Sequence, residues 1–265
     1  MKTIVCPVDF SETAEKAAHY AARIARELDA ELILAHAQHV PSVDAQGTIM
    51  AVKDLVEEQQ AVVSKDLDAL VSRLNSSIGG AIKTWQTFGL VVDMINEMLE
   101  QKSIYMVIMG TKGATNAIDR WIGTTSTDVM NRCDVPMIIV PEGSEFVGWK
   151  RVGYATDFSQ ETDNGILDVQ ELIKPFGATL SIVHVSNKTV DADEMMAVVR
   201  HFEPEVNVDT ITGSDVALEL NDYVWSNDLQ LLALKRHKRN FFERLFHKSV
   251  AQEIAISSQM PILVL

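Results

Sequence analysis

Positive charge is scarce in this sequence. Its 265 residues contain 23 Lys and Arg against 37 Asp and Glu, which gives a formal net charge of −14 at pH 7 and a pI of about 4.9. Neutralising a nucleic-acid backbone requires a positive protein face, and an anionic membrane attracts basic segments. The composition therefore argues against general nucleic-acid binding and against membrane binding, although an acidic protein can still hold one nucleotide in a favourable loop.

Cysteine and long apolar runs are also scarce. The two cysteines, Cys6 and Cys133, are too few for a disulfide framework and lack the spacing of metal ligands. We therefore predict no metal site and expect Cys6 to be a small buried hydrophobic residue. The chain enters a strand-like segment at once, without the apolar core of a signal peptide, and no apolar run reaches membrane-spanning length. These absences predict a cytoplasmic protein.

A glycine-containing segment near the middle of the chain is the main functional signal. The apolar run at 104–109 is typical of a parallel strand buried on both faces, and 124–132 is predicted to be a helix. The positions between and after them have the spacing Gly-x2-Gly-x9-Gly-Thr: Gly110, Gly113, Gly123 and Thr124. Such a loop offers backbone N–H groups and the positive end of a helix dipole to an anion, and its glycines permit positive φ and close approach of a phosphate. The alternative is that these glycines only end a strand and open a helix.

This spacing differs from the P-loop and from the dinucleotide-binding fingerprint. It resembles the nucleotide-binding motif of the universal stress protein family, in its ATP-binding branch, and all four positions match.

The remaining segments alternate between strand and helix. A strand near 3–8 is followed by a helix whose candidate N-cap is Ser11 and whose alanines recur at three- and four-residue steps. This β-α-β order implies parallel strands. Further predicted elements are a strand at 31–37, a long helix at 42–75, a strand at 82–88, a helix at 91–100 and a strand at 137–140. The long helix is either continuous or broken near Gly47.

The chain then begins again. Asp157-Phe158-Ser159 repeats Asp9-Phe10-Ser11, and 27 positions separate each aspartate from a histidine in an apolar strand, His36 and His184. The segment 261–265 repeats 136–140, but the second copy is 23 residues shorter, mostly in the region of the long helix. Three matches in the same order predict a duplicated domain.

The resemblance therefore extends over the whole chain, as a tandem universal stress protein. It implies an α/β fold of two doubly wound domains of the adenine-nucleotide alpha-hydrolase-like type, each an open five-stranded parallel sheet with helices on both faces. We predict a nucleotide-binding domain at 1–141 and a degenerate one at 150–265, joined by a linker at 141–149. In single-domain family members the last strands pair two subunits. Here we predict that the two halves pair as a pseudo-twofold unit, with a homodimer of two chains as an alternative.

The resemblance also implies a ligand site at the carboxyl ends of the strands in the first half. Asp9 resembles an aspartate near the nucleoside, and its alternative role is an Asx-type cap of the following helix. Ala37 resembles the position whose backbone meets the adenine edge, and the glycines and hydroxyls would contact phosphates. Lys112 and Arg120 are charge partners or solvated residues, and the two histidines are expected to be core or supporting groups. The predicted nucleotide-binding residues are Pro7, Val8, Asp9, Ala37, Met109, Gly110, Lys112, Gly113, Gly123, Thr124, Thr125 and Ser126.

The second half departs from this motif. Aligned on its last strand, it carries Lys235, Lys238 and Lys248 where the first half has glycines. A lysine disfavours positive φ and fills the space that a phosphate needs. The basic run at 235–248 is a solvated loop or a docking patch for an anionic partner or ligand.

These features predict an ATP-binding regulatory protein of the stress response, with or without Mg²⁺, that acts on an unidentified protein partner. No catalytic residue is assigned. The alternatives are a slow ATP-hydrolysing enzyme and an interaction module with a vestigial site.

Overall fold

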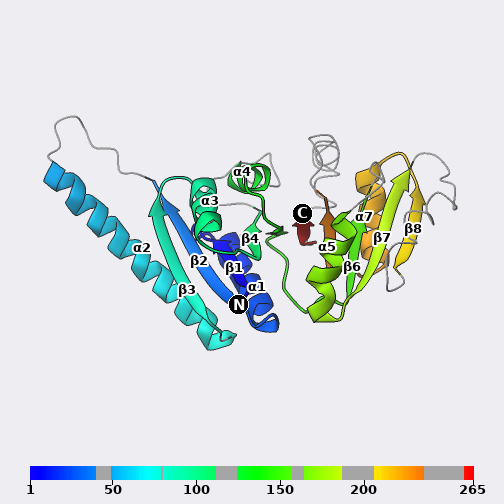
Figure 1. The fold of residues 1–265 in the computed structure, drawn as a ribbon, viewed down its shortest axis with the longest axis horizontal. Helices are drawn as coiled ribbons and strands as arrows, with labels where there is room; N and C mark the ends of the chain where they lie inside the picture. Colours follow the sequence, from blue (N-terminus) through cyan, green and yellow to red (C-terminus); the bar gives the residue numbers. More distant parts are fainter. Residues whose placement is uncertain (40–48, 79, 112–123, 157–163, 187–205, 236–259) are drawn as a thin grey trace. The chain divides into compact units, whose positions relative to one another are not determined.

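The computed structural model describes residues 1–39, 49–78, 80–111, 124–156, 164–186, 206–235 and 260–265 (Figure 1). The chain divides into two compact units, Met1–Met137 and Ile138–Leu265. Within the described part of the chain, no helix is long and apolar enough to cross a bilayer.

The first unit is built on a parallel sheet in the order β3-β2-β1-β4. The Val107 N–H donates to the Pro136 carbonyl at 2.9 Å, one residue before β5 begins. Its strands are β1 (Thr3–Pro7), β2 (Glu31–Gln38), β3 (Ile82–Phe88) and β4 (Met106–Gly110). Strand β5 (Met137–Val140) begins at the last residue of this unit, and its other residues belong to the second unit. The helices are α1 (Glu12–Glu27), α2 (Ile49–Ser77), α3 (Val91–Gln101) and α4 (Thr124–Arg132).

The second unit repeats this arrangement, with a parallel sheet in the order β10-β9-β6-β7-β8. The order β8-β7-β6-β9 matches β3-β2-β1-β4, so the predicted duplication is present in the fold. Its strands are β6 (Arg151–Ala155), β7 (Thr179–Ser186), β8 (Asn207–Thr212), β9 (Leu231–Leu234) and β10 (Ile262–Val264). Its helices are α5 (Asn164–Ile173), the short 3-10 helix η1 (Lys174–Phe176) and α7 (Val216–Ser226).

The first helix follows the pattern expected from its sequence. Ala17, Ala18 and Ala21 are fully buried, as the alanine spacing predicts, and small side chains let α1 lie close to the sheet. The Ser11 hydroxyl accepts the Ala14 N–H at 3.2 Å, which confirms Ser11 as the N-cap.

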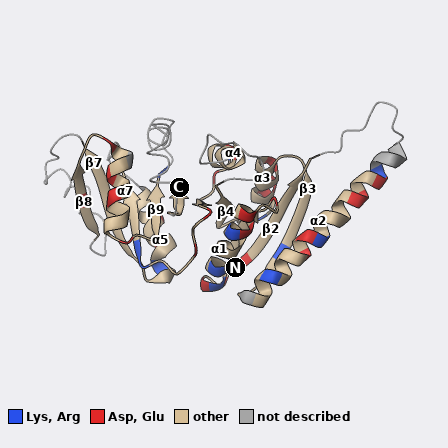
Figure 2. Ribbon diagram, turned by 180° about the vertical axis from the view of Figure 1, so that it is seen from behind, with Lys and Arg blue, Asp and Glu red and all other residues tan. Residues whose placement is uncertain are grey.

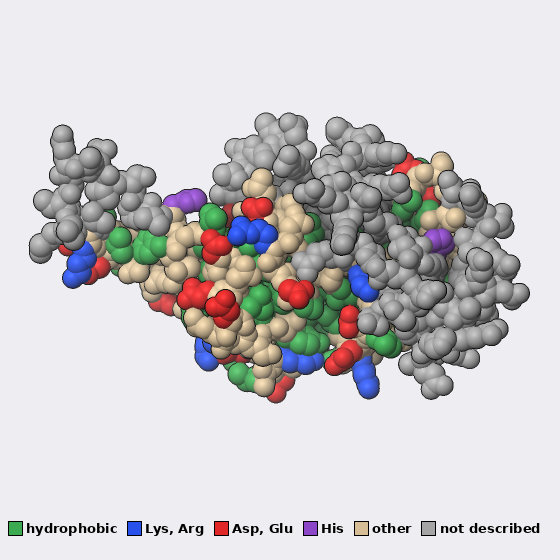
Figure 3. Space-filling view, turned by 45° about the horizontal axis from the view of Figure 1, so that its top comes forward, with side chains coloured by type: hydrophobic (Ala, Val, Ile, Leu, Met, Phe, Trp, Pro, Cys, Tyr) green, Lys and Arg blue, Asp and Glu red, His purple; other side chains and the backbone are tan. Residues whose placement is uncertain are grey.

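The second helix, α2, is much longer than the strands that it accompanies. At about 1.5 Å per residue its 29 residues span about 43 Å. Leu67, Leu70 and Leu74 near its C-terminal end are buried, whereas Leu55 and Val62 are 43% and 54% exposed. Figure 2 shows Lys, Arg, Asp and Glu spread along the same helix, and Figure 3 shows hydrophobic side chains at the surface of its outer half. Residues 42–48, where the predicted helix would start and break, lie outside the described chain.

The segment 141–149, predicted as a linker, is packed within the second unit. Phe146 and Trp149 are buried, and the Trp149 ring lies 4.3 Å from that of Phe176, centre to centre. The Phe146 ring meets both at 5.6 and 5.9 Å. The segment that proline, glycine and serine predict as a linker is therefore held against Phe176 by its two aromatic side chains.

Candidate functional site

The turn after β1 contains a local hydrogen bond to the carboxylate of Asp9. Asp9 is exposed, and its Oδ1 accepts the Ser11 N–H at 3.0 Å, which is the Asx-type geometry considered as one role of this residue. Phe10 has a left-handed backbone with φ 62°. The bend takes the chain directly from the strand into α1, so Asp9 lies at the carboxyl end of the sheet.

The end of β2 lies beside this turn. The Val8 N–H donates to the Ala35 carbonyl at 2.8 Å, and the His36 Nδ1 lies 2.6 Å from the Val8 carbonyl oxygen. The His36 and Phe10 rings are 4.8 Å apart, centre to centre. Ala37 follows immediately and is half-buried, so the predicted adenine-contacting position is adjacent to the turn.

Gly110, at the end of β4, is required for space. A Cβ on this residue would lie 2.9 Å from the Thr13 Cγ2 and 3.0 Å from the Thr13 carbonyl oxygen in the first turn of α1. Its φ is not in the left-handed region. Of the two expected reasons for glycine, positive φ is therefore wrong at this position, and close approach of a phosphate stays a prediction. Close passage of α1 is a further reason that the structure shows.

The first turn of α4 is attached to the same strand end. The Ser126 hydroxyl is buried and donates to the Gly110 carbonyl at 3.1 Å, while Thr124 and Thr125 are exposed. Ser126 thus orients the helix against β4, and the two threonines at the helix N-terminus are the accessible hydroxyls.

The structure brings together part of the predicted site. Strand β1 lies between β2 and β4. The chain adds β2 and β3 on one side of β1 and then crosses over to add β4 on the other side. Ligands of open parallel sheets bind at such a switch point, beyond the carboxyl ends of the strands. Asp9, Ala37 and Gly110 all lie at this edge, with Pro7, Val8 and Met109 just before it. Lys112, Gly113, Arg120 and Gly123 lie outside the described residues.

Titratable and metal-binding chemistry is limited in the described part of the chain. No group of three or more His, Cys, Asp or Glu there could hold a metal ion. Burial raises the pKa of the Cys6 thiol to about 12, so Cys6 is the inert core residue that was expected.

The second unit keeps the histidine hydrogen bond of the first unit but not its glycine at the strand end. The His184 Nδ1 lies 2.9 Å from the Thr156 carbonyl, and the Thr156 N–H donates to the Val183 carbonyl at 3.1 Å. These bonds repeat those of His36 and Val8. Lys235 follows β9 where Gly110 ends β4, and Asp157 lies outside the described residues.

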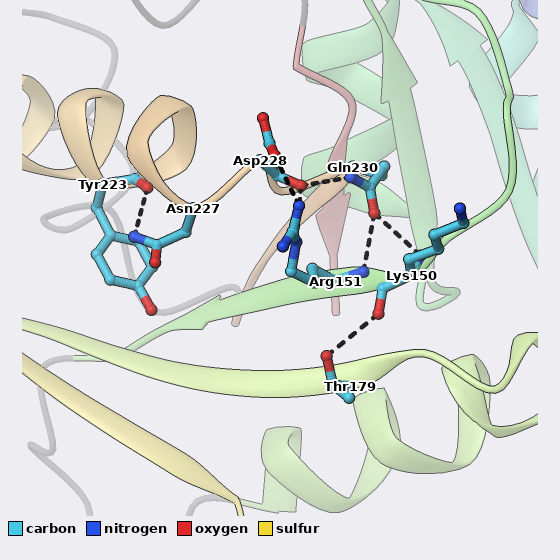
Figure 4. A network of polar contacts seen from close by, with 7 residues as sticks. All are labelled: Lys150, Arg151, Thr179, Tyr223, Asn227, Asp228 and Gln230. Carbon is cyan, nitrogen blue, oxygen red and sulfur yellow. Dashed lines mark hydrogen bonds and ion pairs between the residues drawn. The ribbon is translucent and has the colours of Figure 1, made fainter.

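The amino ends of the second sheet carry a polar network of their own (Figure 4). The Gln230 Oε1 accepts the backbone N–H groups of Lys150 and Arg151 at 3.0 and 2.8 Å. Arg151 pairs with the Asp228 carboxylate at 2.7 Å. This network ties the start of β6 to the residues just before β9, at the amino-terminal edge of the second unit's own sheet.

Sequence reasoning missed two residues of the site. Thr13 sets the space around Gly110, and nothing in its sequence context indicates this. The sequence indicates Phe10 only as part of the repeated Asp-Phe-Ser. In both halves a histidine follows this phenylalanine by 26 positions, and that repetition was the signal for a contact between them.

The fold and this edge define a tandem doubly wound α/β protein with a ligand-type switch point in its first half. The family model described as the universal stress protein family matches residues 1–141, and the chain belongs to that family.

Similar proteins agree with this assignment. Universal stress protein MJ0531 of Methanocaldococcus jannaschii is 28% identical over 142 residues, 52% of this chain and 81% of the relative. Universal stress protein MJ0577 of the same organism is 23% identical over 152 residues, 52% and 94% of the two chains. The structure of a universal stress protein from Archaeoglobus fulgidus is similar over 99% of this chain and 97% of its own, with a TM-score of 0.71 at 16% identity. The last likeness shows that the two-unit fold is shared.

Proposed function

We propose that the first unit binds an adenine nucleotide, ATP with or without Mg²⁺, and acts as a nucleotide-dependent switch or sensor in the cytoplasm during stress. The observation that carries the proposal is the convergence of Asp9, Ala37 and Gly110 at the ends of three adjacent strands. In the proposed site the nucleoside lies at Asp9 and Ala37, and the phosphates lie toward Gly110 and the first turn of α4.

The phosphate end uses backbone groups and the helix N-terminus. Thr124 and Thr125 open α4 and are exposed, and the helix dipole favours an anion there. Hydrogen bonds to charged groups contribute roughly 1.5–3 kcal/mol each. Three or four of them support most of the roughly 8 kcal/mol of a micromolar complex.

The same geometry favours binding over turnover. Phosphoryl transfer requires a group that orients the attacking oxygen. The Ser126 hydroxyl is buried and already donates to the Gly110 carbonyl, so it serves the scaffold. We infer that bound nucleotide orders the loop from Thr111 to Ile122 and that a protein partner recognises the ordered loop.

Asp9 and Asp157 offer a matched test, because they occupy repeated positions in the two halves. Binding of ATP is measured by titration calorimetry for the unmodified chain, Asp9→Ala and Asp157→Ala. We expect Asp9→Ala to weaken binding about tenfold, a loss of about 1.4 kcal/mol, and Asp157→Ala to leave it unchanged. Absence of ATP binding by the unmodified chain would reject the proposal. Equal effects of the two variants would mean that Asp9 acts only as a cap.

A further inference from the structure

His36 makes contact on both sides of Asp9. Its Nδ1 lies 2.6 Å from the carbonyl oxygen of Val8, the residue before Asp9. Its ring lies 4.8 Å from the ring of Phe10, the residue after Asp9, with an angle of 32° between the planes. One side chain on β2 therefore holds both neighbours of the exposed carboxylate.

The Phe10 backbone needs such support. Three described residues other than glycine have positive φ: Phe10, Asp29 and Asp228. Aspartate enters the left-handed region comparatively readily, whereas a bulky aromatic residue there is an outlier. Backbone strain of this kind persists only where surrounding contacts fix it, and it gathers at functional sites. The tilted His36 ring is a contact that can support Phe10 in this conformation.

The His36 proton can be placed by chemistry. A carbonyl oxygen only accepts hydrogen bonds, so the Nδ1 atom that faces Val8 must be the donor. The side chain at this position therefore has to present an N–H at the place of the imidazole Nδ1. An asparagine amide nitrogen can occupy that place, because it is the same number of bonds from Cβ. A glutamine amide is one carbon further out.

The second unit provides an internal reference. His184 makes the equivalent bond to the Thr156 carbonyl at 2.9 Å, so the bond itself belongs to the fold of both halves. The strand end beside it differs, because Lys235 stands in place of Gly110. A contribution to folding should therefore be common to the two histidines, and a contribution to nucleotide binding should belong to His36 alone.

We propose that His36 is a positioning residue for the nucleotide site: it holds the Val8 carbonyl and the Phe10 ring so that Asp9 is presented to the nucleoside. This role of His36 rests on the proposed function. In it, His36 orients Asp9 at the nucleoside end of the site through Val8 and Phe10, without contacting the nucleotide itself.

The test compares His36→Asn, His36→Gln and His184→Gln in the full chain. ATP affinity is measured by titration calorimetry and thermal unfolding by calorimetry without ligand. We expect His36→Gln, which loses both the hydrogen bond and the ring contact, to weaken ATP binding about tenfold. His36→Asn keeps an N–H for the Val8 carbonyl and loses only the ring contact with Phe10, so we expect a smaller loss of about threefold. His184→Gln should lower the unfolding temperature about as much as His36→Gln and leave ATP affinity unchanged.

Three results would overturn the inference while the unmodified chain still binds ATP. These are unchanged affinity in His36→Gln, equal losses in His36→Asn and His36→Gln, and a loss in His184→Gln as large as that in His36→Gln. An unmodified chain that does not bind ATP at all would instead reject the proposed function, and this inference with it.

Discussion

Single residues at the candidate site serve packing as much as ligand binding. Gly110 leaves space for Thr13, and the Ser126 hydroxyl is bonded to the Gly110 carbonyl. Gly110 matches the nucleotide-binding motif and Ser126 is among the predicted nucleotide-binding residues, yet in the structure each joins a helix to the end of β4. A residue at a predicted binding position can therefore be needed for packing of the helices around the loop, apart from any contact with ligand.

Gly110→Ala tests the packing role. The added Cβ would meet Thr13 at 2.9 and 3.0 Å, and overpacking of this kind lowers stability by about 1–3 kcal/mol. Thr13→Ser removes the Cγ2 and relieves the closest of these approaches. We expect the double variant to recover part of the loss in urea unfolding. A Gly110→Ala protein as stable as the unmodified chain would contradict the packing role.

Titration of Tyr223 should lower the stability of the protein at alkaline pH. Burial, followed by its hydrogen bond to Asp209, raises its pKa to about 12 from 10.0, and a Ser181 hydrogen bond opposes this. Because the folded state keeps the proton longer than the unfolded state, this contribution is complete below pH 10 and is lost as the pH rises toward 12. Tyr223→Phe should flatten the fall in unfolding free energy over that range. Identical pH profiles for the two proteins would show that Tyr223 is not its source.

At the scale of elements, the two halves differ in the length of the connection that contains α2 in the first unit. The crossover from Gln38 to Ile82 in the first unit spans 44 positions, and that from Ser186 to Asn207 in the second spans 21. The whole 23-residue difference between the halves therefore lies in this one connection. The second sheet forms without this extra length.

Leucines at the two ends of α2 should differ sharply in their contribution to stability. Leu70 is fully buried and Leu55 is 43% exposed. Leu70→Ala should lower the free energy of unfolding by about 2–5 kcal/mol, whereas Leu55→Ala should change it by no more than about 0.5 kcal/mol. Urea unfolding of the two variants checks this. Comparable losses would mean that the outer half of α2 is packed in solution.

Element types were predictable because their patterns are local. The apolar runs of β1, β2 and β4 and the alanine stripe of α1 indicate buried parallel strands and a closely packed helix. The packing of 141–149 was not predictable from its turn-forming residues, because Phe146 and Trp149 acquire their role only when Phe176 is beside them. The Thr13–Gly110 approach is likewise a tertiary contact between residues almost a hundred positions apart.

At the scale of the whole molecule, duplication followed by divergence accounts for the two halves. Both keep the same strand order and the histidine bond to the end of their first strand. Only the first keeps glycine at the end of its fourth strand, where the second has Lys235. The pairing of the halves as a pseudo-twofold unit, and the domain limits of 1–141 and 150–265, stay predictions.

The central claim is that one half binds nucleotide and the other does not. Native mass spectrometry of the full chain with ATP counts the bound ligands directly, and Gly113→Lys, which copies Lys238, is the matched variant. We expect one nucleotide per unmodified chain and none on Gly113→Lys, with the variant still folded. Two nucleotides per chain, or one on the folded Gly113→Lys protein, would contradict the account.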